Sequence, residues 1–250
     1  MCDEWMPVIE LPLTGDQFLR LPRNAAFKYE LIEGRVVLSP RPRHYHAMLD
    51  LAAAAAGPAP DADDGFQIRP VTAPDFPYLE LVFAAAFHRA QPFASLDDAA
   101  RQEAARRCLE RTRTGGDGPW VEQASFAAVT AEGGRPVGAI FITLLPAGDP
   151  RDWDSYYWDQ PPPADCVARR LGRAHLTWIF VGPLHAGRGV GTALLGAAAR
   201  ALVGLGYGEM ASTFLLGNES SMLWHWRNGF RLLPYPTSKR LMRERLRAKS

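Results

Sequence analysis

The chain has 250 residues, enough for one large domain or for a medium-sized domain with an appendage. Its 28 basic and 27 acidic side chains give a net charge of +1, so no overall field attracts it to nucleic acid or to an anionic membrane. A hydrophobic content of 47% with 22% charged residues is typical of globular proteins. Three cysteines without a CxxC pair argue against a disulfide framework and against a zinc site. Because the chain also lacks a signal peptide and an apolar run that could span a bilayer, we expect a cytoplasmic protein without metal.

The first predicted element is a hairpin near the N-terminus. Apolar runs lie on both sides of Glu33-Gly34 within residues 29–38, a pattern typical of a short hairpin. A hairpin alone is marginally stable in water, so it should pack on another part of the chain. Residues 52–65 contain alanines, turn formers and acids but no bulky apolar side chain, which predicts a linker. The sequence therefore predicts a hairpin appendage over residues 1–51, which we expect, together with the linker, to be dispensable for cofactor binding.

Part of this appendage resembles the opening of a bacterial restriction-endonuclease-like family. The likeness rests on residues 17–22, on residues 29–34 and on His44, and it covers residues 13–48 only. It stops before the acidic and lysine positions that would hold that family's metal. Nuclease chemistry is therefore not expected.

Beyond the linker, strand and helix patterns alternate. The strands are expected at residues 66–71, 123–130, 136–145, 174–181 and 209–215 and from residue 229 on, and the helices at residues 75–88, 96–113, 190–205 and 218–228. This order predicts an α/β protein. A long insertion over residues 146–173 is rich in Asp, Pro and aromatic residues, and insertions of this kind are usually functional or disordered.

A glycine-rich turn follows the strand that ends at Val181 and leads into the helix that begins at Val190. Such a turn presents backbone N–H groups at a helix N-terminus, where the peptide dipoles favour an anion such as a pyrophosphate. Two alternatives stay open. A tight turn can use glycine for steric reasons alone, and a dinucleotide site would use Glu209 to hold a ribose. The second fits less well, because Glu209 precedes its strand instead of ending it.

Together with this turn, the run Asn-Glu-Ser-Ser-Met-Leu-Trp-His-Trp-Arg-Asn-Gly-Phe over residues 218–230 resembles the GNAT superfamily of acyl-CoA-dependent N-acetyltransferases. The likeness covers about residues 66–233. It implies a mixed sheet of about six or seven strands flanked by helices, over residues 66–238, followed by a basic tail over residues 239–250. In the family's loop pattern, RxxGxG or QxxGxG, the glycines match Gly189 and Gly191, whereas Ala186 replaces the Arg or Gln.

The resemblance also implies acetyl-CoA as the co-substrate and assigns residues to it. The strand over residues 175–181 should diverge from its neighbour, so that its backbone can bind the pantetheine arm as a further strand would. Asn218 could donate its amide to the cofactor, or it could simply cap its helix. The residues implied in cofactor binding are Phe180, Val181, Gly187, Arg188, Gly189, Val190, Gly191, Thr192 and Asn218.

Two histidines stand where the family has catalytic groups. His225 occupies the place of a Tyr that protonates the leaving thiolate, and His175 the place of a Glu that relays the amine's proton. Either could instead have a purely structural role. We therefore predict an N-acetyltransferase that acts on a small-molecule or peptide amine, with a non-catalytic acyl-CoA-binding module as the alternative.

The remaining features concern partners. Acids and large aromatics alternate over residues 152–159, which would suit a cationic substrate or would pin the loop to the surface. The basic residues between 239 and 249 could pair with CoA phosphates or form a solvated helix. No membrane or nucleic-acid partner is expected, and a homodimer is left open.

Overall fold

The structure is a computed structural model that describes residues 9–21, 27–40, 44–57, 65–90, 92–149, 158, 160–215 and 218–233. The basic tail expected over residues 239–250 lies outside these ranges, and so does the alternating run over residues 152–159 apart from Trp158.

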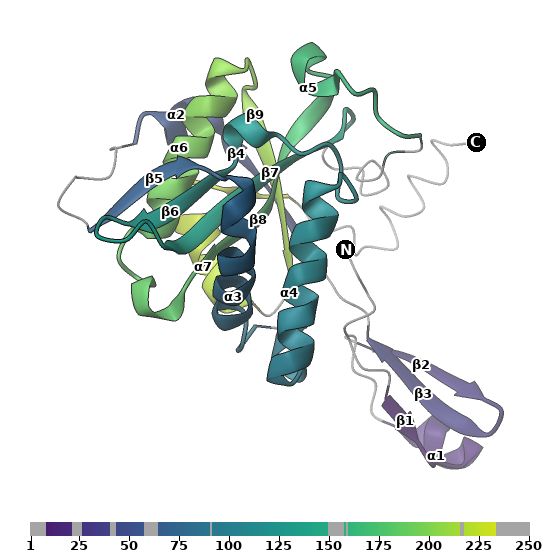
Figure 1. Cartoon of the computed structure of the whole chain (residues 1–250). Helices are drawn as coiled ribbons and strands as arrows, with labels where there is room; N and C mark the ends of the chain where they lie inside the picture. The colour runs from purple at the N-terminus through teal and green to yellow at the C-terminus, as the bar shows by residue number, and fades with distance from the viewer. Residues whose placement is uncertain are drawn as a thin grey trace.

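Seven strands form one mixed sheet (Figure 1). From one edge to the other they are β10 (Arg231–Leu232), β4 (His44–Asp50), β9 (Glu209–Leu215), β8 (Gly172–Val181), β7 (Pro136–Pro146), β6 (Phe126–Thr130) and β5 (Phe66–Pro70). Strands β8 and β9 run parallel, whereas the other neighbouring pairs are antiparallel. This confirms the expected mixed sheet of six or seven strands. The strand predicted over residues 123–130 is shorter than expected, because Glu122–Ala124 form a 3-10 turn.

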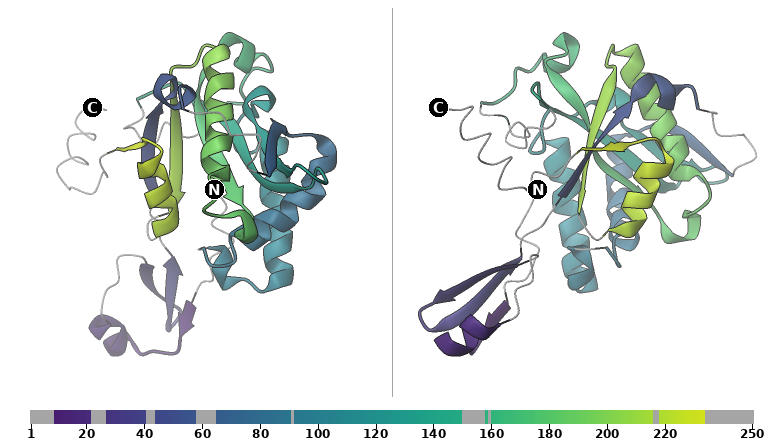
Figure 2. Two further views of the ribbon diagram at one scale, coloured as in Figure 1. Left: turned by 90° about the vertical axis from the view of Figure 1, so that its left-hand side faces the viewer. Right: turned by 180° about the vertical axis from the view of Figure 1, so that it is seen from behind.

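Helices cover both faces of the sheet, as expected (Figures 1 and 2). One face carries α2 (Leu51–Ala55), α6 (Val190–Gly204) and α7 (Glu219–Arg227), and the other carries α3 (Phe76–Ala86) and α4 (Asp98–Arg113). A short helix, α5 (Cys166–Arg169), precedes β8. Among the described residues, no helix has the length and apolar character needed to cross a lipid bilayer.

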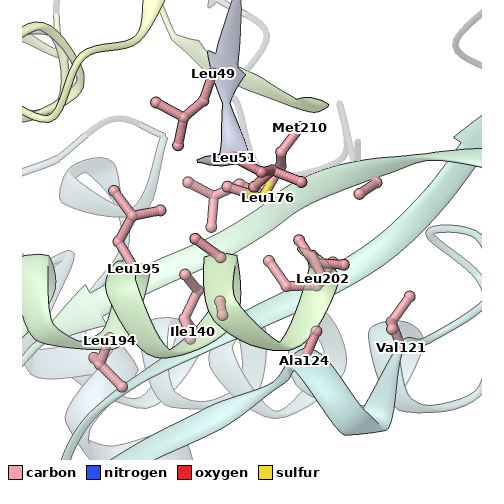
Figure 3. Packing of buried hydrophobic residues seen from close by; sticks show 14 of the residues in the cluster. Leu49, Leu51, Val121, Ala124, Ile140, Leu176, Leu194, Leu195, Leu202 and Met210 are labelled. Carbon is pink, nitrogen blue, oxygen red and sulfur yellow. The ribbon is translucent and has the colours of Figure 1, made fainter. Parts of the chain in front are cut away.

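Two groups of buried side chains lie between these layers. The first packs α6 on the sheet through residues such as Leu194, Leu202 and Ile140 (Figure 3). The second is aromatic and packs α3 on the sheet, with Phe83 in edge contact with Phe180 at 5.1 Å between ring centroids. Each such side chain stabilises the folded state by about 1.5–3 kcal/mol when it is buried, so packing on both faces stabilises the position of β7 and β8.

A separate three-stranded sheet lies near the N-terminus, with α1 (Gly15–Arg20) beside it (Figure 1). Its strands are β1 (Ile9–Leu11), β3 (Arg35–Pro40) and β2 (Phe27–Ile32), in that order. Strands β2 and β3 are joined at Glu33 and Gly34, which both have positive φ angles, 49° and 77°. Positive φ at both central residues is the requirement of the tight hairpin turn whose twist suits adjacent strands. The predicted hairpin is therefore confirmed.

The structure contradicts the domain boundary expected at residue 51. Strand β4 lies inside the seven-stranded sheet, between β9 and β10, and each of its seven residues has a partner in β9. Its middle residues, Ala47, Met48 and Leu49, are buried. Only Ala47, Met48 and Leu49 form an apolar run in this strand, which is too short to mark a separate strand, so the sequence pattern grouped the segment with the preceding hairpin.

The expected linker is also partly helical. Helix α2 begins after Asp50, whose side chain accepts hydrogen bonds from the N–H groups of Ala52 at 2.9 Å and of Ala53 at 3.3 Å. Leu51 is fully buried in the group of side chains around α6. Residues 44–57 therefore belong to the core of the main sheet, and the boundary between the small N-terminal sheet and the main sheet lies before residue 44.

Candidate cofactor and active site

Strands β8 and β9 diverge in the middle of the sheet. They are paired at three positions, from Ala174 with Met210 to Leu176 with Ser212. Within the described residues no pairing between the two strands continues past Leu176, although β8 stays paired with β7 and β9 stays paired with β4. We call the opening between residues 177–181 of β8 and residues 213–215 of β9 the fork. The divergence expected in this strand is therefore present.

A bulge marks the start of the fork. In the pairing of β7 with β8, Phe141 is opposite Trp178 and Ile142 is opposite Leu176, so Thr177 is an extra residue. An extra residue bends its strand and breaks the ladder locally. The bend turns the edge of β8 away from β9, and the backbone groups of β8 that face the fork can then bind an extended ligand as a neighbouring strand would.

The glycine-rich turn connects the end of β8 directly to α6. It contains a 3-10 turn, Pro183–His185, followed by Gly187 and Gly189, whose φ angles are 77° and 81°. The first hydrogen bond of α6 runs from the Ala193 N–H to the Gly189 carbonyl at 2.9 Å, and no side chain of the described residues caps this helix. The N–H groups that precede Ala193 therefore point out of the helix end, where they and the helix dipole favour an anion.

The two family glycines have different physical roles. At Gly189 an added Cβ would meet nothing within 4 Å, so the positive φ is what requires glycine there. At Gly191 an added Cβ would lie 3.0 Å from Nε1 of Trp224, so this glycine allows α6 to approach α7 closely. Trp224 was not singled out in the sequence. A side chain at Gly191 would therefore disturb helix packing as well as any bound phosphate.

The other predicted cofactor residues lie around the fork and the turn. Phe180 and Val190 are buried, Val181 and Gly191 are half-buried, and Gly187, Arg188 and Thr192 are exposed. Buried apolar side chains leave Phe180 and Val190 only their backbone groups for ligand binding. The Asn218 side chain accepts a hydrogen bond from the Ser221 N–H at 3.1 Å, which is the helix-cap arrangement.

His225 is buried against the sheet, with only 3% of its surface exposed. Its Nδ1 donates to the Ser221 carbonyl at 2.7 Å, and its Nε2 lies 2.7 Å from Oγ of Ser212, the last residue of β9 that pairs with β8. The ring also stacks on Phe214 at 4.2 Å. Burial lowers the pKa of His225 to about 4, although its backbone hydrogen bond acts in the opposite direction. The ring is therefore neutral near pH 7, and its hydrogen is on Nδ1.

His175 is buried at the base of the fork, where it joins the two diverging strands. Its Nδ1 lies 3.1 Å from Oγ1 of Thr177 on β8, and its Nε2 lies 3.2 Å from Oγ1 of Thr213 on β9. The same Thr213 oxygen lies 3.3 Å from Nδ1 of His46 on β4. Burial lowers the pKa of His175 to about 3, and the nearby His46 and Arg173 act in the same direction.

No pattern in the sequence indicates that His46, Ser212 and Thr213 lie beside the predicted histidines. A polar residue on an alternating strand is an ordinary pattern, and only the strand pairing reveals its neighbours. Among the described residues, no group of three or more His, Cys, Asp and Glu side chains could hold a metal ion.

The chain is similar to known acetyltransferases. A search of the curated proteins found no match. Among solved structures, a GCN5-related N-acetyltransferase from Sphaerobacter thermophilus is 15% identical with a TM-score of 0.50, over 90% of this chain and 56% of that chain. A GNAT family acetyltransferase from Brucella melitensis, in complex with acetyl-CoA, is 18% identical with a TM-score of 0.44, over 68% of this chain and 88% of that chain.

Likeness at this level of identity bears on the fold alone, and this chain spans only 52% to 57% of the length of three of the solved structures that it matches. The family match is more specific. Residues 93–230 match the acetyltransferase (GNAT) family, and this range includes the fork, the glycine-rich turn and the run that ends at Phe230. Since the match extends over more than half of the sequence, the chain belongs to the acetyltransferase (GNAT) family.

Proposed function

We propose that this protein is an N-acetyltransferase that moves an acetyl group from acetyl-CoA directly to a primary amine of a small molecule or peptide. The observation that carries the proposal is that one continuous segment, residues 177–192, supplies both the open edge of β8 and the uncapped N-terminus of α6. An extended arm that ends in a pyrophosphate needs these two features next to each other.

The residues fit acetyl-CoA in their chemistry. The backbone of Phe180 and Val181 would bind the pantetheine arm, and the backbone from Gly187 to Thr192 would bind the pyrophosphate. Arg188 is exposed at this turn and supplies a positive charge that Ala186 does not. Asn218 would contribute through its amide nitrogen, because its Oδ1 accepts the helix-cap hydrogen bond.

We expect the substitution Gly189→Val to weaken acetyl-CoA binding at least tenfold, a loss of about 1.4 kcal/mol. Valine at a φ of 81° would distort the turn and place methyl groups at the helix end. Titration calorimetry with acetyl-CoA measures the effect. Gly134→Val is the matched control, because Gly134 also has a positive φ, 60°, and open space around it, but lies in the turn between β6 and β7. Unchanged affinity in a folded Gly189→Val protein would contradict the cofactor assignment.

The transfer step needs groups that move protons. The amine must lose a proton as it attacks the thioester carbonyl, and the thiolate that leaves must gain one. We propose His175 as the base and His225 as the group that returns a proton to the thiolate. Because Nδ1 of the neutral ring donates to the Ser221 carbonyl, Nε2 accepts from the Ser212 hydroxyl, so His225 would take up a proton at Nε2 before it returns one through that hydroxyl at the base of the fork.

If His225 has this role, the substitution His225→Phe should lower kcat at least tenfold while the affinity for acetyl-CoA stays within about twofold. Phenylalanine can keep the stacking on Phe214 but removes the partner of Ser212. His225→Tyr should restore part of the loss, because a phenol can donate a proton. Steady-state kinetics checks the three proteins, with thermal unfolding as the test of folding. A His225→Phe protein with more than a third of the wild-type kcat would assign this histidine a structural role.

A non-catalytic acyl-CoA-binding module is the second candidate function. The specific observations in its favour are Ala186 in the place of the family's Arg or Gln and the burial of both candidate catalytic histidines. Titration with acetyl-CoA, followed by measurement of thiol release with ethanolamine, benzylamine and a lysine-containing peptide, separates the two. Binding without thiol release would support the module.

A further inference from the structure

We propose that His46, on the N-terminal strand β4, is a positioning residue of the acetyl-transfer site. By donating a hydrogen bond to the Thr213 hydroxyl, it keeps the hydrogen of that hydroxyl directed at His175, in a relay through which His175 takes a proton from the acceptor amine by way of Thr213. This inference rests on the proposed function, and it adds a segment that lies outside the family match at residues 93–230.

The relay crosses four neighbouring strands on one face of the sheet, the face that carries α3 and α4. Its members are His46 on β4, Thr213 on β9, His175 and Thr177 on β8, and Thr143 on β7. The register brings them together, because His46 is directly opposite Thr213 and His175 is directly opposite Thr143. Side chains of directly opposite residues lie on the same face and within reach of each other.

The hydrogen positions follow from counting donors, starting at Thr143. The Thr143 hydroxyl donates to the Asp117 carbonyl at 3.1 Å, since a carbonyl can only accept. Its single hydrogen is then used, so the Thr177 hydroxyl, 2.8 Å away, must donate to Thr143. A competing contact from Thr177 to the His175 carbonyl is longer, at 3.5 Å.

The same counting of donors determines which ring nitrogen carries the hydrogen in His175 and in His46. Because the Thr177 hydrogen points to Thr143, the hydrogen between Thr177 and His175 is on Nδ1 of His175. In a neutral ring Nε2 then has no hydrogen and accepts from the Thr213 hydroxyl. That uses the Thr213 hydrogen, so Nδ1 of His46 must donate to Thr213. Every hydrogen bond of the relay therefore points one way, from His46 to the Asp117 carbonyl, and Nε2 of His175 is the acceptor of the Thr213 proton.

This direction gives the amine a route to its base. Both histidines are buried, whereas Thr177 and Thr213 are half-buried and flank the start of the fork. When the amine nitrogen forms its bond to the thioester carbonyl carbon, an N–H proton passes to Oγ1 of Thr213 and the hydroxyl hydrogen passes to Nε2 of His175. The C–S bond breaks, the electron pair leaves on the thiolate, and His175 later releases its proton to water, while the thiolate receives its proton by way of His225.

The charged and titratable groups near His46 and His175 affect how readily the two rings take up a proton. His44 lowers the pKa of His46 from the same strand, and Arg173 on β8 lowers the pKa of His175, so both oppose protonation of the two rings. The Asp117 side chain is engaged elsewhere, with Arg111 at 2.8 Å and with the Thr112 hydroxyl at 2.7 Å. His175 therefore holds the proton only briefly, which suits a relay and not a permanent charge.

The first test needs no substrate. Long-range ¹H–¹⁵N spectra of the full chain at pH 7 report which ring nitrogen carries the hydrogen, and the spectra of His46→Asn and His175→Asn assign the signals. The expected result is hydrogen on Nδ1 in both rings, the less common form of free histidine. Hydrogen on Nε2 in either ring of the wild-type protein would overturn the relay, whether or not the protein transfers acetyl groups.

The second test uses turnover with ethanolamine, benzylamine and a lysine-containing peptide. Thr213→Val should lower kcat about tenfold or more with an unchanged KM for acetyl-CoA, whereas Thr213→Ser, which keeps the hydroxyl, should retain most of it. His46→Leu should lower kcat, and His46→Asn, whose amide can still donate to Thr213, should restore it. In mixtures of H₂O and D₂O the wild-type rate should follow a curved dependence on isotope fraction, because two protons move together.

The outcomes separate the relay from the proposed function. If the wild-type protein releases thiol with one of these amines and a folded Thr213→Val protein keeps its kcat, the relay is overturned while the acetyltransferase function stands. If His46→Asn and His46→Leu lose kcat equally, the positioning role of His46 is overturned. If the wild-type protein binds acetyl-CoA but turns over none of the amines, the proposed function falls together with the relay's role in it, and the spectra still decide the direction of the hydrogen bonds.

Discussion

A protein that begins at residue 58 should fail to fold, whereas one that begins at residue 41 should fold and bind acetyl-CoA as the full chain does. The first lacks β4 and α2, and therefore the strand between β9 and β10. It also loses the buried side chains of Met48, Leu49 and Leu51. At about 1.5–3 kcal/mol for each such side chain, the loss is comparable to the whole stability of a domain, about 5–15 kcal/mol.

The second protein loses only the small N-terminal sheet. In the described part of the chain, the strands of that sheet pair with each other and not with the seven-stranded sheet. Circular dichroism, size-exclusion chromatography and acetyl-CoA titration on the two truncated proteins and the full chain make the comparison. Cooperative unfolding and full acetyl-CoA affinity in the protein that begins at residue 58 would show that β4 is not integral to the site.

Lowering the pH from 6.5 to 5 should reduce the free energy of unfolding by about 5 kcal/mol through three histidines, since each loses about 1.4 kcal/mol per pH unit well below pH 6.5 and about half of that at pH 6.5. Burial lowers the pKa of His46 and His175 to about 3 and that of His225 to about 4. In the unfolded chain each titrates near 6.5, so the unfolded state binds more protons between these values. The contribution to stability is therefore complete above pH 6.5 and is lost as the pH falls toward 4 for His225 and toward 3 for His46 and His175.

Urea unfolding at closely spaced pH values measures this effect, because the slope of stability against pH gives the number of protons taken up. The slope should fall by about one third in His225→Phe, since one of the three groups is then absent. Repeating the series at high salt separates surface charges, which are screened, from the buried rings, which are not. A protein whose stability is flat between pH 6.5 and 5 would contradict the neutral, buried state of these histidines.

Local patterns in the sequence were enough to predict much of the fold. The predicted elements beyond residue 66 recur in the structure, because hydrophobic periodicity and turn residues act over a few neighbours. The same holds for Gly34, Gly187 and Gly189, whose positive φ angles meet the demands of tight turns. The glycine-rich turn and the run that ends at Phe230 also indicated the family that the residue match then established.

What only the tertiary structure decided depends on contacts between distant segments. Nothing in residues 44–50 indicates a partner at residues 209–215, because strand pairing is set by register and burial across the whole sheet. Because of that pairing, β4 belongs to the main sheet, and the domain boundary lies before residue 44. The same pairing places His46 beside Thr213. The neutral state of His225 likewise comes from burial against Phe214 and Ser212, which its neighbours in the sequence do not reveal. The sequence by itself therefore determined which segments form the glycine-rich turn and its flanking elements, and the packing of distant strands determined which side chains form hydrogen bonds with His175 and His225.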